Sequence, residues 1–215
     1  MARNDGGGEQ IQNNESVDTE MKFVLATANP GKIREMREIL TGLGIEAVTR
    51  EELGINIDIE ETGSDFIENA TLKASAICRM TGLPAIADDS GLVVETLGGE
   101  PGLMSSSYGG ESLSNRERCE FLLRNMEGME QRSAKFVCVI VCAFPDGSII
   151  TAQGECRGEI LTFPRGVNGF GYDPIFLIEG MDKTMAEITQ EEKNAVSHRG
   201  AALRDFYEKL SKQTF

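Results

Sequence analysis

The chain has 215 residues and is 40% hydrophobic, which suits one domain with a sizeable buried core. Its formal net charge of −14 argues against a protein that tracks along DNA or RNA, because phosphate backbones need clustered lysines and arginines, although local cations in a cleft still attract a small anion. No apolar run approaches the roughly 18 residues that cross a bilayer, no signal-peptide pattern is present, and the five cysteines form no C-x-x-C pair, so we expect a soluble cytoplasmic protein with no membrane or nucleic-acid partner.

Residues 1–20 are rich in glycine, asparagine, glutamine and acids, and we expect them to form a disordered tail ahead of a single domain at residues 21–215. In the first half of that domain, short apolar runs alternate with apolar residues at helical spacing. Gly44 is expected to end the first helix, and Ser64 can cap the second. The sequence predicts strands at 23–26, 45–48, 84–87 and 92–96, a turn at 29–31, and helices at about 33–43 and 65–80.

The second half of the domain contains two long apolar runs joined by the turn Pro145-Asp146-Gly147, a pattern typical of paired strands. A final helix is expected after Ser197, which can cap it. The sequence predicts a helix at 114–126, the strand pair at 134–144 and 148–157, and a further strand at 174–178. Helices and strands that alternate first and long paired strands that follow predict an α/β fold with a mixed sheet.

The first candidate site is the segment Thr27-Ala28-Asn29-Pro30-Gly31-Lys32, at the junction of a strand and a helix. Such a junction offers free backbone N–H groups and the positive end of a helix dipole to an anion, and Lys32 adds a formal charge. The segment is not a Walker loop, because G-x-x-x-x-G-K-[ST] is absent. Phosphate binding is one interpretation, and an ordinary turn is the other.

The second candidate site joins the acidic loop Glu60-Glu61-Thr62-Gly63 to the helix that follows it. Asn69 and Lys73 are spaced i, i+4 and therefore share one face of that helix, which we expect to lie opposite the apolar stripe. The alternative is a solvated polar face behind an acidic loop.

The third candidate site is Asp88-Asp89-Ser90, which follows an apolar strand. Two adjacent acids at the end of a buried strand are costly without a partner. A divalent metal would compensate them, and carboxylate oxygens together with substrate phosphate suit Mg²⁺. One carboxylate could instead activate a water molecule, and an Asx turn in a capped loop is the structural alternative.

The last two candidate sites lie near the C-terminus. In Gly169-Phe170-Gly171-Tyr172-Asp173 the glycines let the backbone approach a flat ligand on which Phe170 can stack, and a glycine-rich hairpin is the alternative. Lys193 and Ser197-His198-Arg199-Gly200 gather donors at the start of a helix. His198 is either one of these donors or a structural histidine, and Gly200 there suggests a close approach of backbone or ligand.

Taken together, these segments resemble the inosine triphosphate pyrophosphatase family of purine nucleoside triphosphate pyrophosphatases, from about Lys22 to Leu210. The matching strings are LATANPGKIRE, EETGSDFIENATLKA, PAIADDSGLVVETLGGEPG, NGFGYDPIF and EEKNAVSHRGAAL. Each string is moderately specific alone, whereas their order and spacing are highly specific. The resemblance implies an elongated central sheet, two lobes around an active-site cleft, and a homodimer.

The resemblance also implies Mg²⁺-dependent hydrolysis of non-standard purine triphosphates, ITP, dITP and XTP, to the monophosphate and pyrophosphate. Asp89 would accept a proton and would also bind the metal. A second metal ligand would be Glu60 or, alternatively, Glu61. Thr27, Asn29 and Lys32 would bind phosphates, Lys73 would act near the metal and triphosphate, and Ser90 would contact the substrate. The base and the nucleotide would be cradled by Phe170, Gly171, Tyr172, Asp173, Lys193, His198 and Arg199.

The chain departs from the family pattern after Pro101-Gly102, where an aromatic residue and Ser-Ala-Arg-Tyr are usual. Ser107 stands where the arginine is expected, which puts one cationic contact in doubt. Activity remains the expectation, because the acids, the lysines and the His-Arg pair are all present. A pyrophosphatase for modified pyrimidine or thymidine triphosphates, a nucleotide sensor without activity, and, least of all, a nucleic-acid-binding module remain as alternatives.

Overall fold

The computed structural model describes residues 21–213, so the tail predicted for residues 1–20 lies outside the described residues. A six-stranded mixed sheet in the order β2-β1-β3-β4-β5-β6 forms the centre of the fold. The strands are β1 Phe23–Leu25, β2 Ala47–Thr49, β3 Ala85–Val94, β4 Ser133–Ala143, β5 Ile149–Ile160 and β6 Phe176–Ile178. The helices are α1 Pro30–Gly42, α2 Phe66–Thr81, α3 Asn115–Asn125, α4 Gln190–Val196 and α5 His198–Leu210, with short 3-10 turns at Glu95–Leu97, Gly102–Ser106 and Asp173–Ile175.

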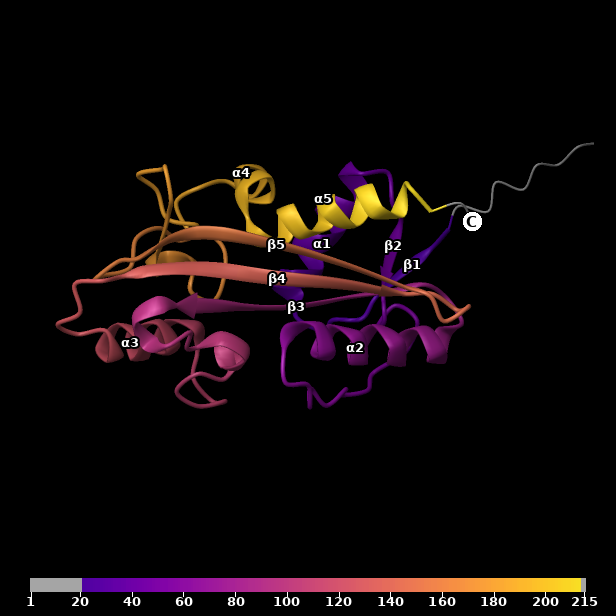
Figure 1. Cartoon of the computed structure of the whole chain (residues 1–215), viewed down its shortest axis with the longest axis horizontal. Coiled ribbons are helices and arrows are strands. Elements are labelled where there is room, and N and C mark those ends of the chain that lie inside the picture. Colours follow the sequence, from indigo (N-terminus) through magenta and orange to yellow (C-terminus); the bar gives the residue numbers. More distant parts are fainter. Residues whose placement is uncertain (1–20, 214–215) are drawn as a thin grey trace, which may run out of the picture.

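The strands β1, β2 and β3 are parallel. β1 and most of β3 are buried because helices cover both faces of this part of the sheet, whereas the edge strand β2 is only partly buried. From β3 to β6 the pairing is antiparallel. The strands β3, β4 and β5 are much longer than β1 and β2, so they extend the sheet well beyond them, as Figure 1 shows. The predicted α/β fold with an elongated mixed sheet is confirmed, whereas the division into two lobes stays a prediction.

The strand β3 has one paired edge and one largely open edge. It pairs with β4 over its whole length, from Ala85 opposite Ala143 to Val94 opposite Ala134. It pairs with β1 only at Ala85 and Ile86, because β1 ends at Leu25. Within residues 21–213, the backbone edge of β3 from Ala87 to Gly91 has no neighbouring strand, before the isolated bridge from Val93 to Pro101. This opening positions the site described below.

Three apolar clusters hold the helices against the sheet. One lies between the sheet and helices α1 and α5, and it includes Met36, Leu40 and Phe206. A second packs α2 through Ala70, Ala74 and Ile77 against the other face. The third joins α3 to the segment around β6 at the far end of the long strands. In Figure 1, α4 and α5 lie above the sheet, and α2 and α3 lie below it. Helix α1 packs on the same face as α5.

Several local predictions need correction. Asp88 and Asp89 do not end a strand, because β3 runs unbroken through them and merges the two strands predicted at 84–87 and 92–96. Asp65 caps α2 in place of Ser64, since its side chain accepts from the Glu68 N–H. The helix α4 was not predicted, and the strand predicted at 174–178 begins as a 3-10 turn.

The polar face predicted for α2 is also wrong in orientation. Asn69 and Lys73 are buried beside Ala70 and Ala74 and do not face away from the apolar stripe. A carboxylate on β3 replaces water as their partner, which makes this burial tolerable. All five cysteines are free thiols in the structure. None of the helices in the described part of the chain has the length and apolar character to cross a membrane.

Candidate active site

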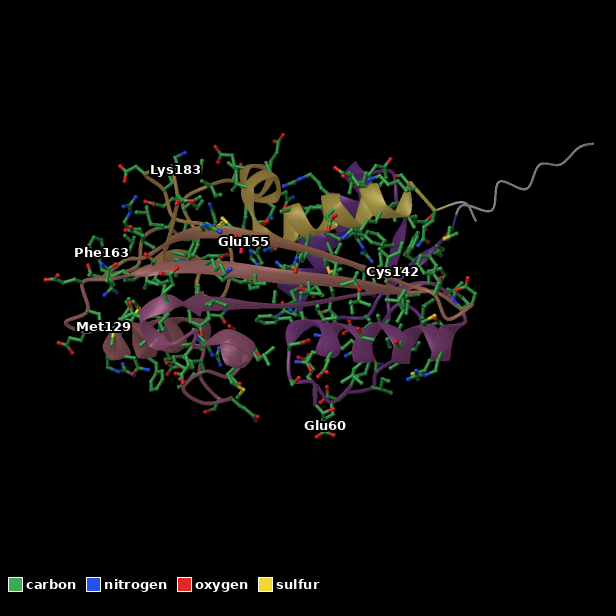
Figure 2. The ribbon with its side chains drawn as sticks, in the orientation of Figure 1. Glu60, Met129, Cys142, Glu155, Phe163 and Lys183 are labelled. Atoms are coloured by element: carbon green, nitrogen blue, oxygen red, sulfur yellow. The ribbon has the colours of Figure 1, made fainter. Side chains whose placement is uncertain are left out.

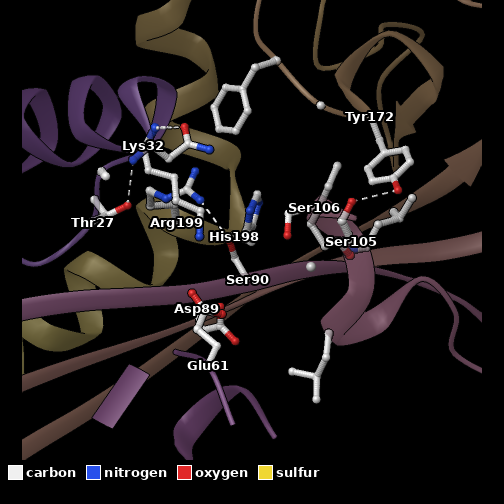
Figure 3. Close-up of a pocket in the computed structure, with 18 of the residues that line it drawn as sticks. Thr27, Lys32, Glu61, Asp89, Ser90, Ser105, Ser106, Tyr172, His198 and Arg199 are labelled. Atoms are coloured by element: carbon white, nitrogen blue, oxygen red, sulfur yellow. Dashed lines mark hydrogen bonds between the residues drawn. The ribbon is translucent and has the colours of Figure 1, made fainter. Parts of the chain in front are cut away.

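A cavity of about 380 Å³ opens along the free edge of β3. It has the size of small-molecule sites in proteins. Six lysines and arginines line it against four acids, so its charge balance is positive within a strongly acidic chain. Figure 3 draws 18 of its residues and labels ten of them. Among the predicted site residues, the lining includes Thr27, Asn29, Lys32, Glu61, Lys73, Asp89, Ser90, Phe170, Gly171, Tyr172, Asp173, Lys193, His198 and Arg199.

The first wall of the cavity is the start of α1. The Asn29 side-chain oxygen caps this helix by accepting from the N–H groups of Gly31 (2.9 Å) and Lys32 (3.2 Å). The Thr27 hydroxyl accepts from the Asn29 N–H at 3.2 Å and fixes the turn. Within residues 21–213 the amide NH₂ of Asn29 makes no hydrogen bond, so it remains a donor beside the positive end of the helix dipole. The predicted turn at 29–31 is thus the cap and first turn of a helix.

The two acids of β3 lie on opposite faces of the sheet, because successive side chains of a strand alternate. Asp88 forms ion pairs with Lys32 (3.1 Å) and Arg199 (3.0 Å) on one face. Asp89 forms an ion pair with Lys73 (3.2 Å) on the other. Figure 3 shows this separation, with Asp89 and Glu61 on one side of β3 and Lys32 and Arg199 on the other. An open strand edge lets a single cavity reach both faces.

The environments of the two acids move their pKa values in opposite directions. Burial favours the neutral form of Asp88, but the charges of Lys32 and Arg199 outweigh it and hold the pKa of Asp88 well below its usual range. Burial raises the pKa of Asp89 above its usual range, and Lys73 and Lys32 offset this only in part. Asp88 is therefore a permanent anion that orders cations, whereas Asp89 is the more basic carboxylate and the better proton acceptor.

Lys73 connects Asp89 to the acidic loop before α2. Its Nζ lies 2.9 Å from Glu61 Oε1 and 3.2 Å from Asp89 Oδ1. Burial lowers the pKa of Lys73, but the charges of Asp89, Asp88 and Glu61 outweigh it and raise this pKa above its usual value. The loop is held in place because Asn69 Oδ1 accepts from the Gly63 N–H at 2.8 Å. A Cβ at Gly63 would lie 2.7 Å from that same oxygen, so only glycine permits this approach.

Glu60 and Glu61 have different positions in the structure. Both side chains are exposed, but Glu61 lines the cavity and Glu60 is absent from the lining. In Figure 2, Glu60 points away from the sheet at the outer edge of the loop. Of the two glutamates expected to help bind the metal, Glu61 therefore lines the cavity and pairs with Lys73, and Glu60 does not line it. The metal-binding role of either residue stays a prediction.

The donor set suits a hard cation. Glu61 and Asp89 direct one carboxylate oxygen each at a common positive group, the Lys73 ammonium. Within residues 21–213 there is no group of three or more histidine, cysteine or acidic side chains arranged to hold a metal ion. Mg²⁺ typically takes only one or two protein carboxylates, with phosphate and water oxygens completing its shell. The residues present fit that ion and do not fit a metal held by protein alone.

Phe170 and two cations form the opposite wall. The Lys193 Nζ lies 4.7 Å from the Phe170 ring centroid, and the Arg199 guanidinium carbon lies 5.8 Å from it. The Phe170 N–H donates to Asp173 Oδ2 at 2.8 Å, and the same carboxylate pairs with Lys193. Burial raises the pKa of Asp173, while Lys193 opposes this shift.

The Phe170 ring also lies directly over the start of α1. A Cβ at Gly31 would come within 2.7 Å of the Phe170 ring. The lack of a side chain at Gly31 therefore leaves room for the Phe170 ring. The wall formed by the start of α1, which suits phosphate, and the aromatic wall formed by Phe170 meet at this contact.

Glu35 was missed by the sequence analysis, although it joins the two walls. It is 1% exposed, and its carboxylate pairs with Lys193 (2.8 Å) and with Arg199. Burial raises the pKa of Glu35, but the Arg199 and Lys193 charges outweigh it and lower this pKa. The available signal was its position one turn after Lys32 and directly before the buried Met36.

His198 and Tyr172 are buried at the back of the cavity. The His198 ring stacks on Phe136 with centroids 4.8 Å apart. Burial, with Arg199 and Lys193 nearby, lowers the pKa of His198 well below its usual value, so the imidazole is neutral. The Tyr172 hydroxyl donates to the Ser105 carbonyl at 3.0 Å. Gly200 is explained by packing, since a Cβ there would lie 2.0 Å from the Asn194 carbonyl of α4.

Comparison with known proteins decides the family. The Ham1 family model matches residues 23–209. The chain belongs to the Ham1 family. A relative from Thermus thermophilus named dITP/XTP pyrophosphatase is 50% identical over 190 residues, which are 87% of this chain and 91% of the relative. A relative of the same name from Escherichia coli O157:H7 is 47% identical and covers 85% of this chain and 94% of its own length.

Solved structures of Ham1 proteins have the same fold. The structure of the Staphylococcus aureus Ham1 protein is 40% identical, has a TM-score of 0.81, and covers 90% of this chain and 100% of its own. A HAM1 protein from Coxiella burnetii is 43% identical with the same TM-score and coverage. The family match spans every element that lines the cavity, from β1 to the start of α5.

Proposed function

We propose that this Ham1-family chain hydrolyses the non-standard purine triphosphates dITP, XTP and ITP to the monophosphate and pyrophosphate, with Mg²⁺ as cofactor. Its enzyme class, a nucleoside triphosphate pyrophosphatase, follows from the family and from relatives that are about half identical over most of both chains. The substrates and the metal are the proposal itself, and the cavity supports them.

One observation carries this proposal. Glu61 and Asp89 direct their carboxylates at the same cation in a cavity that also holds Lys32 and the open start of α1. Acids for a metal and donors for phosphates thus lie within one small space. A bound Mg²⁺, held by Glu61, Asp89 and phosphate oxygens, would neutralise phosphate charge and make the phosphorus easier to attack.

The protein side chains would divide the remaining tasks. Lys32, the Asn29 amide and the N–H groups at the start of α1 would bind phosphate oxygens and fix the triphosphate. Lys73 would move from its carboxylate partners to the phosphates as these bind. Asp89, the carboxylate with the raised pKa, would accept the proton from the attacking water. Asp88 would take no proton and would hold Lys32 and Arg199 in position.

The aromatic wall would select the base. The base would stack on Phe170, beside donors from Lys193 and Arg199. Hypoxanthine and xanthine carry an oxygen acceptor at C6 where adenine carries an amino donor. A donor that faces the amino group would be left without an acceptor, at a cost of about 1–3 kcal/mol.

Product analysis tests this function. Purified protein is incubated with ITP and Mg²⁺, and the products are separated by anion-exchange chromatography. Inosine monophosphate and pyrophosphate are expected in equal amounts. Release of orthophosphate with inosine diphosphate would show that a different bond is cleaved. Parallel reactions with dITP, XTP, ATP and thymidine triphosphate rank the bases.

The homodimer implied by the sequence resemblance is part of this proposal. The chain has a mass of 23.4 kDa. Light scattering is expected to give twice that mass, and a monomer mass over the working concentration range would exclude the dimer.

A further inference from the structure

Two of the cations that line the cavity have no carboxylate partner. Four of the six lysines and arginines in the lining are in ion pairs, namely Lys32, Lys73, Lys193 and Arg199. Within residues 21–213 no ion pair includes Arg50 or Arg118. Arg50 is half-buried, whereas Arg118 is only 6% exposed. Arg118 is therefore the cation whose charge most needs an external partner.

The contacts of Arg118 leave most of its hydrogen-bonding capacity unused. Its Nη2 donates to the Gly110 carbonyl at 3.2 Å. Its Nε is buried and has no hydrogen-bond partner in the part of the chain that the structure describes. A guanidinium carries five N–H donors and cannot lose its charge, so burial with a single carbonyl acceptor is unfavourable unless a ligand supplies acceptors.

The position of Arg118 connects it to the aromatic wall. The next residue along α3, Cys119, donates from its thiol to the Gly171 carbonyl at 3.3 Å. The neighbouring Tyr172 donates to Ser105, and Ser105 lines the cavity together with Arg118. Helix α3 thus packs against the segment that carries Phe170. Figure 3 shows Tyr172 and Ser105 at the end of the cavity opposite Thr27 and Lys32.

Arg118 also lies next to the one departure from the family pattern. Its acceptor, Gly110, donates from its own N–H to the Ser107 carbonyl at 2.8 Å. Ser107 stands where the family resemblance places an arginine. The guanidinium expected at position 107 is absent, but the guanidinium of Arg118 on α3 lies beside the same loop.

We propose that Arg118 binds the purine base of the substrate by donating its free guanidinium N–H groups to an oxygen of the base. This inference rests on the proposed function. A guanidinium has donors only, so it accepts the oxygen of hypoxanthine or xanthine and gains nothing from a hydrogen at the same position. Arg118 is then a specificity residue that acts on substrate binding and not on the attack at phosphorus.

The test compares substrates with and without the oxygen. kcat and KM are measured with Mg²⁺ for ITP and for the triphosphate of unsubstituted purine riboside, which lacks the C6 oxygen. Inhibition by tripolyphosphate reports on the phosphate end alone. The variants are Arg118→Gln, Arg118→Lys and the control Arg116→Gln, which alters an exposed arginine two residues away on the same helix. Unfolding midpoints without ligand show whether each variant is folded.

Arg118→Gln is expected to raise KM for ITP by about 10- to 100-fold, the loss typical of a hydrogen bond to a charged group. kcat for ITP, KM for the purine riboside triphosphate and inhibition by tripolyphosphate should stay near wild type. Arg118→Lys keeps the charge without the planar fork of donors and should raise KM for ITP by less. Arg116→Gln should leave every constant unchanged.

Other outcomes overturn the assignment. An unchanged KM for ITP would show that Arg118 does not touch the substrate. Equal weakening of both nucleotides and of tripolyphosphate would assign Arg118 to the phosphates. If wild-type protein turns over no nucleotide, the proposed function fails separately. Calorimetric binding of inosine monophosphate then tests Arg118 alone: weaker binding by Arg118→Gln supports its contact with the base, and equal binding excludes it.

Discussion

At the scale of single residues, the site depends on charges that lie close together and differ in their tasks. Asp88 and Asp89 are neighbours in sequence, yet strand alternation gives them separate partners and opposite pKa shifts. One acid orders cations, and the other is left basic enough to take a proton. Lys73 is the charge that most strongly limits the raised pKa of Asp89.

The pH dependence of turnover should follow from this pair. Turnover needs ionised Asp89, so the rate should fall as pH drops through the pKa of Asp89. Lys73→Met removes the positive charge that pairs with Asp89 in the free enzyme. This raises that pKa and should move the acid limb of the residual kcat/KM, which reports the free enzyme, up by about one pH unit. Lys135→Gln, at an exposed ion pair, is the control. An acid limb that stays in place would assign the proton to another group.

The buried Glu35 makes a second residue-scale prediction, on stability. Glu35→Gln leaves Lys193 and Arg199 without their shared counter-charge and should lower the free energy of unfolding by about 3–5 kcal/mol. Glu38→Gln alters an exposed carboxylate of the same helix and should change little. Urea unfolding of both variants measures these effects.

The pH dependence of that difference has a definite sign. The pKa of Glu35 is lowered in the folded state, so its stabilisation is fully present above the unfolded pKa of about 4.3. It is lost as pH falls through the folded pKa. The stability gap between wild type and Glu35→Gln should therefore shrink below about pH 4. A gap that is constant with pH would mean that the carboxylate charge does not stabilise the fold.

At the scale of elements, the approach of the Phe170 loop to the start of α1 joins the phosphate wall to the aromatic wall. Gly31→Ala should displace the Phe170 ring, because the added Cβ would come within 2.7 Å of it. The backbone at Gly31 is helical, so alanine is otherwise favourable there. KM for ITP should therefore rise by about two- to tenfold, the range of an aromatic stacking contact, with little loss of stability.

A matched control lies at the other end of the same helix. A Cβ at Gly42 would meet no atom within 4 Å, so Gly42→Ala should be neutral or slightly stabilising and should leave KM unchanged. Steady-state kinetics of the two variants measure the difference. Equal KM values for both variants would show that Phe170 does not contact the substrate.

At the scale of the whole molecule, most of the fold could be predicted because local patterns determine it. Apolar periodicity predicted α1, α3, α5 and the long hairpin of β4 and β5 within a few residues. The short helix α4 was missed because its seven residues contain too few apolar positions to show a period. The strand β3 appeared as two pieces because its polar centre, Asp88 to Ser90, interrupts the apolar pattern while pairing with β4 continues.

The candidate site could be predicted only in part, because its chemistry depends on long-range contacts. Spacing on α2 placed Asn69 and Lys73 on one face, but only packing against β3 shows that this face is buried. The sequence also could not show that Glu61, and not Glu60, lines the cavity, because this depends on the long-range ion pair of Glu61 with Lys73. The sequence could not assign Glu35 and Arg118 to the site, because neither residue belongs to a recognisable local motif. Their place at the site depends on how α1 and α3 pack beside the cavity.

The most direct test of this account is the Mg²⁺ dependence of ITP hydrolysis in the paired variants Glu61→Gln and Glu60→Gln. Glu61 lines the cavity and pairs with Lys73, whereas Glu60 lies outside the cavity. Glu61→Gln should lower kcat/KM by about 100-fold and raise the Mg²⁺ concentration needed for half-maximal rate, because a carboxylate ligand is lost. Glu60→Gln should behave like wild type. Equal activity of the two variants, or loss only in Glu60→Gln, would contradict a metal site formed by Glu61 and Asp89.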